Sequence, residues 1–373
     1  MRLRDLGLAI GTGVPGAFNA ITDVDGVRVG QTTLIEGDAA ADRTTAVIRT
    51  GVTVIQPREG RVRDMPAFAG VSTLNGNGEF TGLEWVRESG LLTTPIAITN
   101  THSVGTVRDA LVGYDADHAR RGEYWSMPVV GETYDGGLND INGLHVRAEH
   151  VHRALQGATG GPVAEGNVGG GTGMTCHEFK GGTGSSSRVL GDDAGGWTVG
   201  VLVQANYGRR EDLRVDGWPV GRVLTTDVVP APATGTDRQT PPGSGSGSII
   251  IVVATDAPLL PDQCRRLAQR TFVGLARVGG GCADSSGDIA LAFSTANADI
   301  PAEYLDVASA PFPVLAMPHQ GLSPLFTAVA DATEEAICNA LLSARTMTGR
   351  DGVVAHALEP ERLVIALRQL RSV

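Results

Sequence analysis

Short β-branched runs alternate with longer segments of helical pattern between residues 27 and 204. The short runs predict strands at Val27–Leu34, Thr44–Ile48, Val52–Gln56, Pro95–Thr99, Met127–Val130 and Thr198–Gln204. Helices are predicted at Val104–Arg121 and Arg147–Leu155. Gly160–Gly184 is mainly Gly, Thr and Ser, a composition incompatible with regular structure throughout. Alternating strands and helices indicate an α/β or α+β protein with stacked layers.

The sharpest change of composition falls just before Ser248. Residues 229–247 read VPAPATGTDRQTPPGSGSG, which is typical of linkers and mobile loops. Ile249–Val253 follows at once, and this continuous β-branched run predicts a strand buried on both faces. Downstream, the pattern predicts a helix at Pro261–Val278, a strand at Ile289–Phe293 and a helix at Leu322–Ala344 with Ser323 as N-cap and Pro324 as its first residue.

Composition and charge exclude several classes of protein. The 373-residue chain is 42% apolar and can bury a sizeable core, and its 51 glycines form no collagen-like repeat. A net charge of −11 without a basic stripe argues against nucleic acid as a partner. Because no apolar stretch reaches the ~20 residues of a membrane span, we expect a cytoplasmic protein with no membrane partner. No CxxC pair occurs, so we expect reduced cysteines, no metal and no cofactor.

The junction at Ser248 suggests a nucleophile. A serine hydroxyl reacts poorly until a base removes its proton. A serine at the start of a chain has such a base in its own α-amino group, whose pKa is about 7.7–8.0. A flexible segment before the strand would let the hydroxyl attack the Gly247 carbonyl. A linker leading into an ordinary strand explains the same pattern, and Ser244 and Ser246 offer further serines.

Polar residues interrupt the predicted strand at Met127–Val130. The segment Gly131–Asp140 reads GETYDGGLND. Its Glu132 carboxylate could hold an ammonium group while the Tyr134 phenol donates to a developing oxyanion. A turn rich in Asp, Asn and Gly is the structural alternative.

Two further clusters stand at predicted strand ends. Asn206 follows the apolar strand Thr198–Gln204, and an amide facing a cleft can donate to an oxyanion or merely cap the strand. Ser286 and Asp288 lie two residues apart before the Ile289 strand, so both side chains can face one way and form a relay to a nucleophile. The Ser-Gly-Asp sequence is also common in turns.

Taken together, these segments resemble the self-processing serine aminopeptidases, the family of the L-aminopeptidase/D-esterase-amidases and the β-peptidyl aminopeptidases. The resemblance covers nearly the whole chain and depends on the order and number of its motifs. They are Asn19–Val24, Leu74–Glu79, Thr99–Gly105, Gly131–Asp140, Glu165–Lys180, Ala205–Gly208 and Gly247–Ile250.

The resemblance implies an α+β fold, a four-layer αββα sandwich like that of the N-terminal-nucleophile hydrolases, formed by residues 1–373 as a single domain. It implies self-cleavage between Gly247 and Ser248 into chains 1–247 and 248–373, which stay associated. A homo-oligomer of these heterodimers is expected, often with four copies. No cofactor is implied.

The resemblance also assigns roles. Ser248 would be the nucleophile, Asn206 an oxyanion donor with Tyr134 beside it, and Glu132 the group that holds the substrate's amine. Ser286 and Asp288 would support Ser248, with aspartate where some members have glutamate. The expected activity is hydrolysis of N-terminal residues from small peptides, amides or esters with a free amine.

Three alternatives remain open at this point. Ornithine acetyltransferases resemble this fold and self-cleave, but they use a threonine nucleophile, as do the related hydrolases of nylon-type oligomers. Serine at position 248 and Glu132 favour hydrolysis. The third alternative is an uncut, non-enzymatic scaffold.

Overall fold

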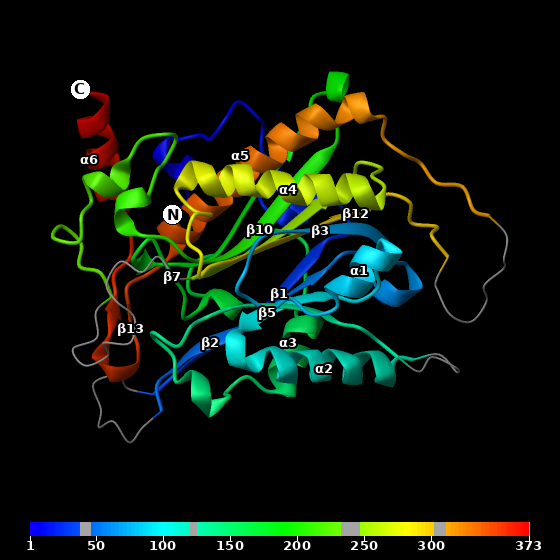
Figure 1. The fold of residues 1–373 in the computed structure, drawn as a ribbon, viewed down its shortest axis with the longest axis horizontal. Helices are drawn as coiled ribbons and strands as arrows, with labels where there is room; N and C mark the ends of the chain where they lie inside the picture. The colour runs from blue at the N-terminus through cyan, green and yellow to red at the C-terminus, as the bar shows by residue number, and fades with distance from the viewer. Residues whose placement is uncertain (38–45, 120–124, 233–246, 302–310, 373) are drawn as a thin grey trace.

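Two β-sheets lie face to face, and helices cover their outer faces (Figure 1). This computed structural model describes residues 1–37, 46–119, 125–232, 247–301 and 311–372. The layers follow the order helix, sheet, sheet, helix, which confirms the α+β, αββα architecture expected from the resemblance.

The larger sheet has six strands in the order β4-β3-β12-β11-β10-β9. Neighbouring strands are antiparallel except β11 and β12, which are parallel and joined by the crossover helix α4. The strands are β3 (Ala67–Gly76), β4 (Leu91–Leu92), β9 (Gly182–Val189), β10 (Thr198–Asn206), β11 (Ser248–Thr255) and β12 (Gly287–Ser294).

The smaller sheet has four strands in the order β1-β2-β5-β6. Its only parallel pair in the described ranges is β5 with β6, and helix α2 connects the two. The strands are β1 (Arg28–Glu36), β2 (Ile48–Gln56), β5 (Ile96–Asn100) and β6 (Val129–Thr133). Two short hairpins complete the β-structure, β7 (Thr175–Cys176) with β8 (Phe179–Lys180) and β13 (Met347–Thr348) with β14 (Val354–Ala355).

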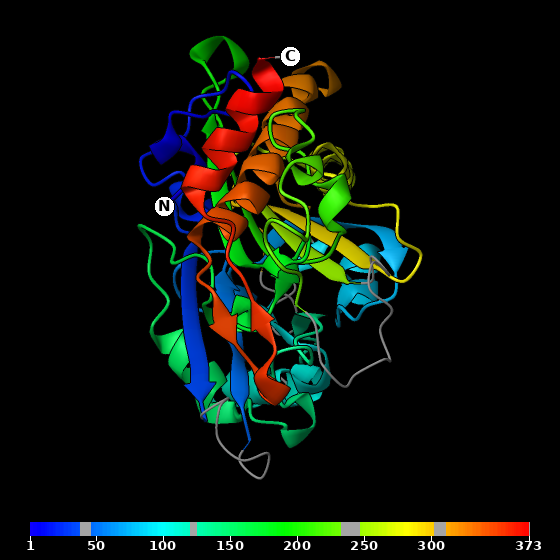
Figure 2. The ribbon, with the colours of Figure 1, turned by 90° about the vertical axis from the view of Figure 1, so that its left-hand side faces the viewer.

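Helices α4 and α5 pack on the larger sheet, and α2 and α3 pack on the smaller one. Figure 2 shows α6 and the carboxyl terminus on the side of the molecule where α5 lies. The helices are α1 (Leu83–Ser89), α2 (Val104–Asp117), α3 (Ala148–Gln156), α4 (Pro261–Val278), α5 (Leu322–Ser343) and α6 (Pro360–Arg371).

Strand β11 separates two apolar cores. Ile249 and Ile251 point to the core under α4 and α5, whereas Ile250 and Val252 point to the core between the sheets. All four side chains are buried, which confirms the prediction of a strand buried on both faces. The sheets approach closely here, because a methyl group added at Gly131 in β6 would lie 3.2 Å from the Ile250 side chain.

The sequence predicted several elements well and missed others. Helix α4 spans Pro261–Val278 as predicted. Strand β9 was missed, because its sequence GTGSSSRV is polar although it lies buried in the sheet. Strand β3 and helices α1 and α6 were also not anticipated. Most of the 229–247 linker lies outside the described residues.

Two predictions need correction. The predicted strands Thr44–Ile48 and Val52–Gln56 are not separate, because β2 runs from Ile48 to Gln56, and Thr44 lies outside the described residues. The proposed N-cap Ser323 is wrong. Helix α5 begins at Leu322 with Gly321 at the N-cap, since a 3₁₀ turn leads directly into the helix and places Ser323 in its first turn.

Candidate active site

Ser248 is the first residue of β11 and is 6% exposed. Its register places it opposite Asn206, the last residue of β10, and opposite Gly287, the first residue of β12. Side chains alternate along a strand, so Ser248 points to the same side as Ile250, between the two sheets. Its hydroxyl is therefore held where the buried strand meets the edge of the inter-sheet core.

The backbone N–H of Gly287 serves both halves of the Gly247–Ser248 junction. It donates to Ser248 Oγ at 3.3 Å and to the Gly247 carbonyl oxygen at 3.1 Å. Neither Gly247 nor Gly287 has room for a larger side chain. A methyl group added at Gly247 would lie 2.1 Å from the Asn206 carbonyl oxygen, and one at Gly287 would lie 2.5 Å from the Asn77 carbonyl oxygen.

Ser286 and Asp288 flank Gly287 and bond to each other. Ser286 Oγ donates to Asp288 Oδ1 at 2.7 Å, and Asn75 Nδ2 on β3 donates to Asp288 Oδ2 at 2.7 Å. Burial raises the pKa of Asp288, and the two hydrogen bonds oppose that rise. The predicted hydroxyl–carboxylate pair is therefore formed, and it reaches the Ser248 hydroxyl through the backbone of Gly287.

The Asn206 amide is fixed at both ends. Its Oδ1 accepts the Thr175 N–H at 2.8 Å, and its Nδ2 donates to the Tyr134 carbonyl oxygen at 2.9 Å. These partners settle the orientation of the amide, since the flipped form would oppose two oxygens. One Nδ2 proton is used by Tyr134, and no acceptor in the part of the chain that the structure describes takes the second, which leaves it for a ligand. The Tyr134 side chain is 51% exposed, and its ring lies close over Gly136.

Glu132 on β6 is a buried carboxylate with two donors. Its Oε1 accepts the Glu79 N–H at 2.9 Å, and its Oε2 accepts the Thr101 hydroxyl. Gly78 lies between Glu132 and Gly287, because a methyl group added at Gly78 would lie 3.3 Å from both Glu132 Oε1 and Gly287 Cα. Burial raises the pKa of Glu132, and the Thr101 hydrogen bond opposes that rise. A buried carboxylate of this kind is suited to bind a cation.

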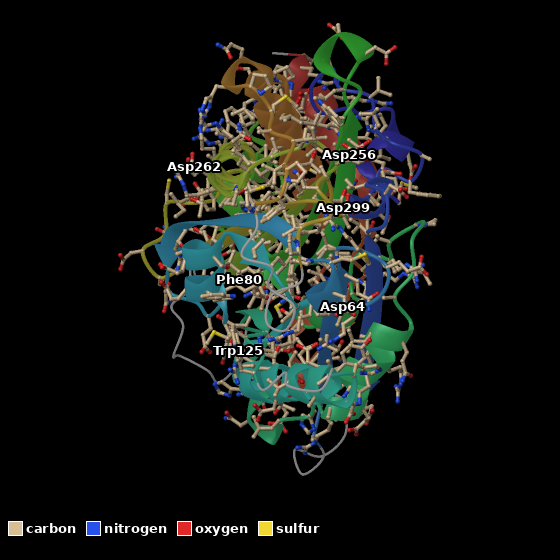
Figure 3. The ribbon with its side chains drawn as sticks, turned by 90° about the vertical axis from the view of Figure 1, so that its right-hand side faces the viewer. Asp64, Phe80, Trp125, Asp256, Asp262 and Asp299 are labelled. Carbon is tan, nitrogen blue, oxygen red and sulfur yellow. The ribbon has the colours of Figure 1, made fainter. Side chains whose placement is uncertain are left out.

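Two cavities border these residues. One, of about 460 Å³, is lined on the helix side of the sheet by Tyr207, Gly208, Gly280, Cys282, Ser285 and Ser286, among others. The second, also of about 460 Å³, has a more apolar lining that includes Gly78, Phe80, Trp85, Met127 and Ile289. Phe80 and Trp125, which contacts Trp85 edge-to-face, lie on the face of the molecule seen in Figure 3.

The structure thus brings Ser248, Asn206, Ser286 and Asp288 to adjoining strand ends, with Glu132 across Gly78. Sequence reasoning missed Gly287, Asn75, Thr101 and Thr175, which act through backbone groups or hold the predicted residues. A glycine between two polar residues at the start of a predicted strand is typical of a close approach between backbones, and this signal could have identified Gly287. In the described ranges, no group of three or more His, Cys, Asp or Glu side chains gathers to hold a metal ion.

Comparison with known proteins assigns the family. A model of Peptidase family S58 matches residues 19–355. The chain belongs to this family. It is 50% identical to the β-peptidyl aminopeptidase BapA of Sphingosinicella microcystinivorans, over 99% of this chain and 92% of that protein.

Two solved structures are similar to this S58 peptidase along its length. A β-aminopeptidase from a Burkholderia species is 59% identical with a TM-score of 0.92, over 99% of each chain. The L-aminopeptidase D-Ala-esterase/amidase of Ochrobactrum anthropi, described as a variant of the Ntn hydrolase fold, is 43% identical with a TM-score of 0.83, over 99% of this chain and 98% of that one.

This S58 peptidase is therefore a serine aminopeptidase and amidase of the N-terminal-nucleophile type. The comparisons therefore favour hydrolysis over acyl transfer and over a non-enzymatic scaffold. None of the helices described is long and apolar enough to cross a bilayer.

Proposed function

We propose that Ser248 is the nucleophile and that self-cleavage between Gly247 and Ser248 frees it. The observation that carries this proposal is the Gly287 N–H, which donates both to Ser248 Oγ and to the Gly247 carbonyl oxygen. The attacking oxygen and the oxygen that becomes an oxyanion thus share one donor at the end of a rigid strand.

Self-cleavage proceeds as an acyl shift followed by hydrolysis. Ser248 Oγ attacks the Gly247 carbonyl carbon, and the oxyanion is held by the Gly287 N–H. The C–N bond then breaks, its nitrogen takes a proton, and an ester joins Gly247 to Ser248 Oγ. Water hydrolyses this ester and leaves the Gly247 carboxylate and the free amine of Ser248.

Turnover uses the same hydroxyl with its new base. The free α-amine of Ser248, with a pKa of about 7.7–8.0, removes the hydroxyl proton as Oγ attacks the substrate carbonyl. The free Nδ2 proton of Asn206 stabilises the oxyanion, with Tyr134 beside it. The Ser286–Asp288 pair supports the amine of Ser248, which passes the proton to the leaving amine or alcohol as the scissile bond breaks. Water then hydrolyses the acyl-enzyme and releases the N-terminal residue with a free carboxylate.

Glu132 selects substrates with a free amine. Its buried carboxylate pairs with the substrate's N-terminal ammonium, so the scissile carbonyl of a peptide, amide or ester falls near Ser248. The relatives named β-peptidyl aminopeptidase and β-aminopeptidase support β-residues as substrates. The side chain of the N-terminal residue enters the cavity bordered by Gly78 and Phe80.

A denaturing gel with N-terminal sequencing tests the cleavage. Purified protein should separate into chains 1–247 and 248–373, the second beginning Ser-Ile-Ile-Ile. A second chain that begins at Ser244 or Ser246, or an intact chain that is active, would disprove the assignment.

The rates on an aminoacyl p-nitroanilide and its N-acetylated form test the amine site. Removing one partner of a buried charge pair costs about 3–5 kcal/mol, so the free amine should be preferred more than about a hundredfold. Equal rates would remove Glu132 from the substrate site.

We further propose a homo-oligomer of the cleaved heterodimers, with four copies, in the cytoplasm. Exposed apolar side chains such as Val14, Leu315 and Ile365 supply surface for contacts between copies, and the four cysteines are free. Light scattering and cell fractionation test the two statements, and a monomer or a secreted product would contradict them.

A further inference from the structure

The only lysine of the chain lies next to the proposed oxyanion site. Lys180 ends β8 and is fully buried, whereas the other Lys/Arg positions of the chain are arginines. Its Nζ donates to the carbonyl oxygens of Met174 at 2.8 Å, Gly181 at 2.8 Å and Gly171 at 3.4 Å. An ammonium has three protons for three converging carbonyls, which a flat guanidinium does not match.

The Met174–Thr175 peptide group connects Lys180 to Asn206. The carbonyl of this peptide accepts from Lys180 Nζ at 2.8 Å, and its N–H donates to Asn206 Oδ1 at 2.8 Å. Burial lowers the pKa of Lys180 to about 7, but three carbonyl acceptors match its protonated form. The ammonium on the Met174 carbonyl polarises the peptide and strengthens its N–H as a donor.

Asp135 stands at the opposite end of the amide. The Asn206 Nδ2 donates to the carbonyl of the Tyr134–Asp135 peptide at 2.9 Å, and the Asp135 carboxylate interacts with the N–H of that same peptide. Asp135 is fully buried and accepts from Asn139 Nδ2 at 3.0 Å. Burial raises the pKa of Asp135 to about 7, and hydrogen bonds from Thr50 and Asn139 oppose that rise. In its ionised form the carboxylate makes the carbonyl a stronger acceptor.

We propose that Lys180 and Asp135 are positioning residues that hold and polarise the Asn206 amide through these two peptide groups. The Lys180 charge makes Oδ1 more negative and the free Nδ2 proton more positive, whereas Asp135 strengthens the acceptor that fixes the other Nδ2 proton. The free Nδ2 proton then stabilises the substrate's oxyanion more strongly. This inference rests on the proposed oxyanion role of Asn206.

Lys180→Met tests the proposal, because it removes the ammonium and keeps most of the stem. We expect kcat on the p-nitroanilide to fall by about tenfold or more. This loss should be smaller than the loss of about 10²–10³-fold that follows removal of a whole oxyanion donor. KM should stay within about twofold, since Glu132 is untouched. Rates are expressed per mole of free Ser248 N-terminus, so uncut protein does not count.

A matched control removes a buried cation elsewhere. Arg188 on β9 is 1% exposed and pairs with Glu335 at 2.7 Å. Arg188→Met should lower Tm but leave kcat unchanged, whereas Lys180→Arg, which keeps the charge, should recover part of the lost kcat. A kcat loss in Arg188→Met as large as in Lys180→Met would overturn the proposal.

A double-mutant cycle with Asn206→Ala separates positioning from general stability. If Lys180 acts through Asn206, the double variant has the same kcat as Asn206→Ala alone. Multiplying effects would overturn the proposal. Wild-type kcat in Asn206→Ala would instead refute the proposed function.

Asp135→Asn gives a second, isosteric cycle in case Lys180→Met does not fold. It should lower kcat with KM unchanged and likewise add nothing to Asn206→Ala. Unchanged kcat in this variant, or multiplying effects, would overturn the proposal.

Discussion

The two ends of β11 both carry a hydroxyl, and the hydroxyls differ in their hydrogen bonds. At the carboxyl end, Thr255 Oγ1 donates to the Thr198 carbonyl oxygen at 2.7 Å and accepts the Ala257 N–H at 3.1 Å. At the amino end, the one hydrogen bond to Ser248 Oγ found in the described residues comes from Gly287, and the hydroxyl only accepts.

The difference separates a structural hydroxyl from a reactive one. The Thr255 hydroxyl proton is already donated to a backbone carbonyl, so removing it would break an existing hydrogen bond. The Ser248 proton is available to a base, and the surrounding side chains come from four strands. Burial alone therefore does not mark the nucleophile, because both residues are buried.

The largest effect is expected from removing each hydroxyl in turn. Ser248→Ala should abolish self-cleavage and lower turnover about 10⁶-fold, because both reactions need the same oxygen. Thr255→Val should leave both reactions intact and cost about 1–3 kcal/mol of stability. It removes the acceptor of the Ala257 N–H and leaves the Thr198 carbonyl, among the described residues, with only the Asp256 N–H at 3.4 Å. Gels, p-nitroanilide assays and thermal melts measure the pair. Normal cleavage and turnover in Ser248→Ala would place the nucleophile elsewhere.

The next effect distinguishes the two oxyanion donors at the amino end. Asn206→Ala should lower kcat about 10²–10³-fold with KM little changed, because Asn206 acts on the substrate's oxyanion. Self-cleavage should persist, since the Gly287 N–H already donates to the Gly247 carbonyl oxygen. Steady-state kinetics and the rate of chain appearance are the measurements. Slowed cleavage with full turnover per mole of cleaved chain would reverse the assignment of the two donors.

A smaller effect is expected from a methyl group at the scissile glycine. In Gly247→Ala the methyl meets the Asn206 carbonyl oxygen at 2.1 Å, and overpacking of about 1–3 kcal/mol should slow self-cleavage about tenfold or more. Gly76→Ala is the control, because Gly76 pairs with Gly287 but has open space for a methyl group. A time course on gels compares the two, and equal rates would show that the junction relaxes.

The smallest effect is on the pH dependence of KM. Glu132 binds an ammonium only when ionised, and burial raises its pKa. On the acid side, KM should therefore rise about tenfold per pH unit, starting above the ordinary glutamate pKa of about 4.3. On the alkaline side, KM should rise as the substrate amine, with a pKa of about 7.7–8.0, loses its charge. A KM that stays flat on the acid side down to about pH 4.3 would contradict the assignment.

Local patterns determined much of this protein from the sequence alone. The abrupt change at Gly247–Ser248, the β-branched run of β11 and the proline at the start of α4 each depend on neighbouring residues, and each was predicted. The residues Glu132, Asn206, Ser286 and Asp288 stood out for the same reason, because these polar groups flank apolar runs at the ends or beginnings of strands.

The tertiary structure alone decided which groups meet. Asn75, Thr101, Thr175 and Gly287 contact the site through strand register and backbone atoms, and no local pattern encodes a register between strands distant in sequence. Strand β9 escaped prediction because its serines bond to buried backbone and side chains of other elements. The same holds for Lys180, whose role depends on three carbonyls that only the fold brings to its ammonium.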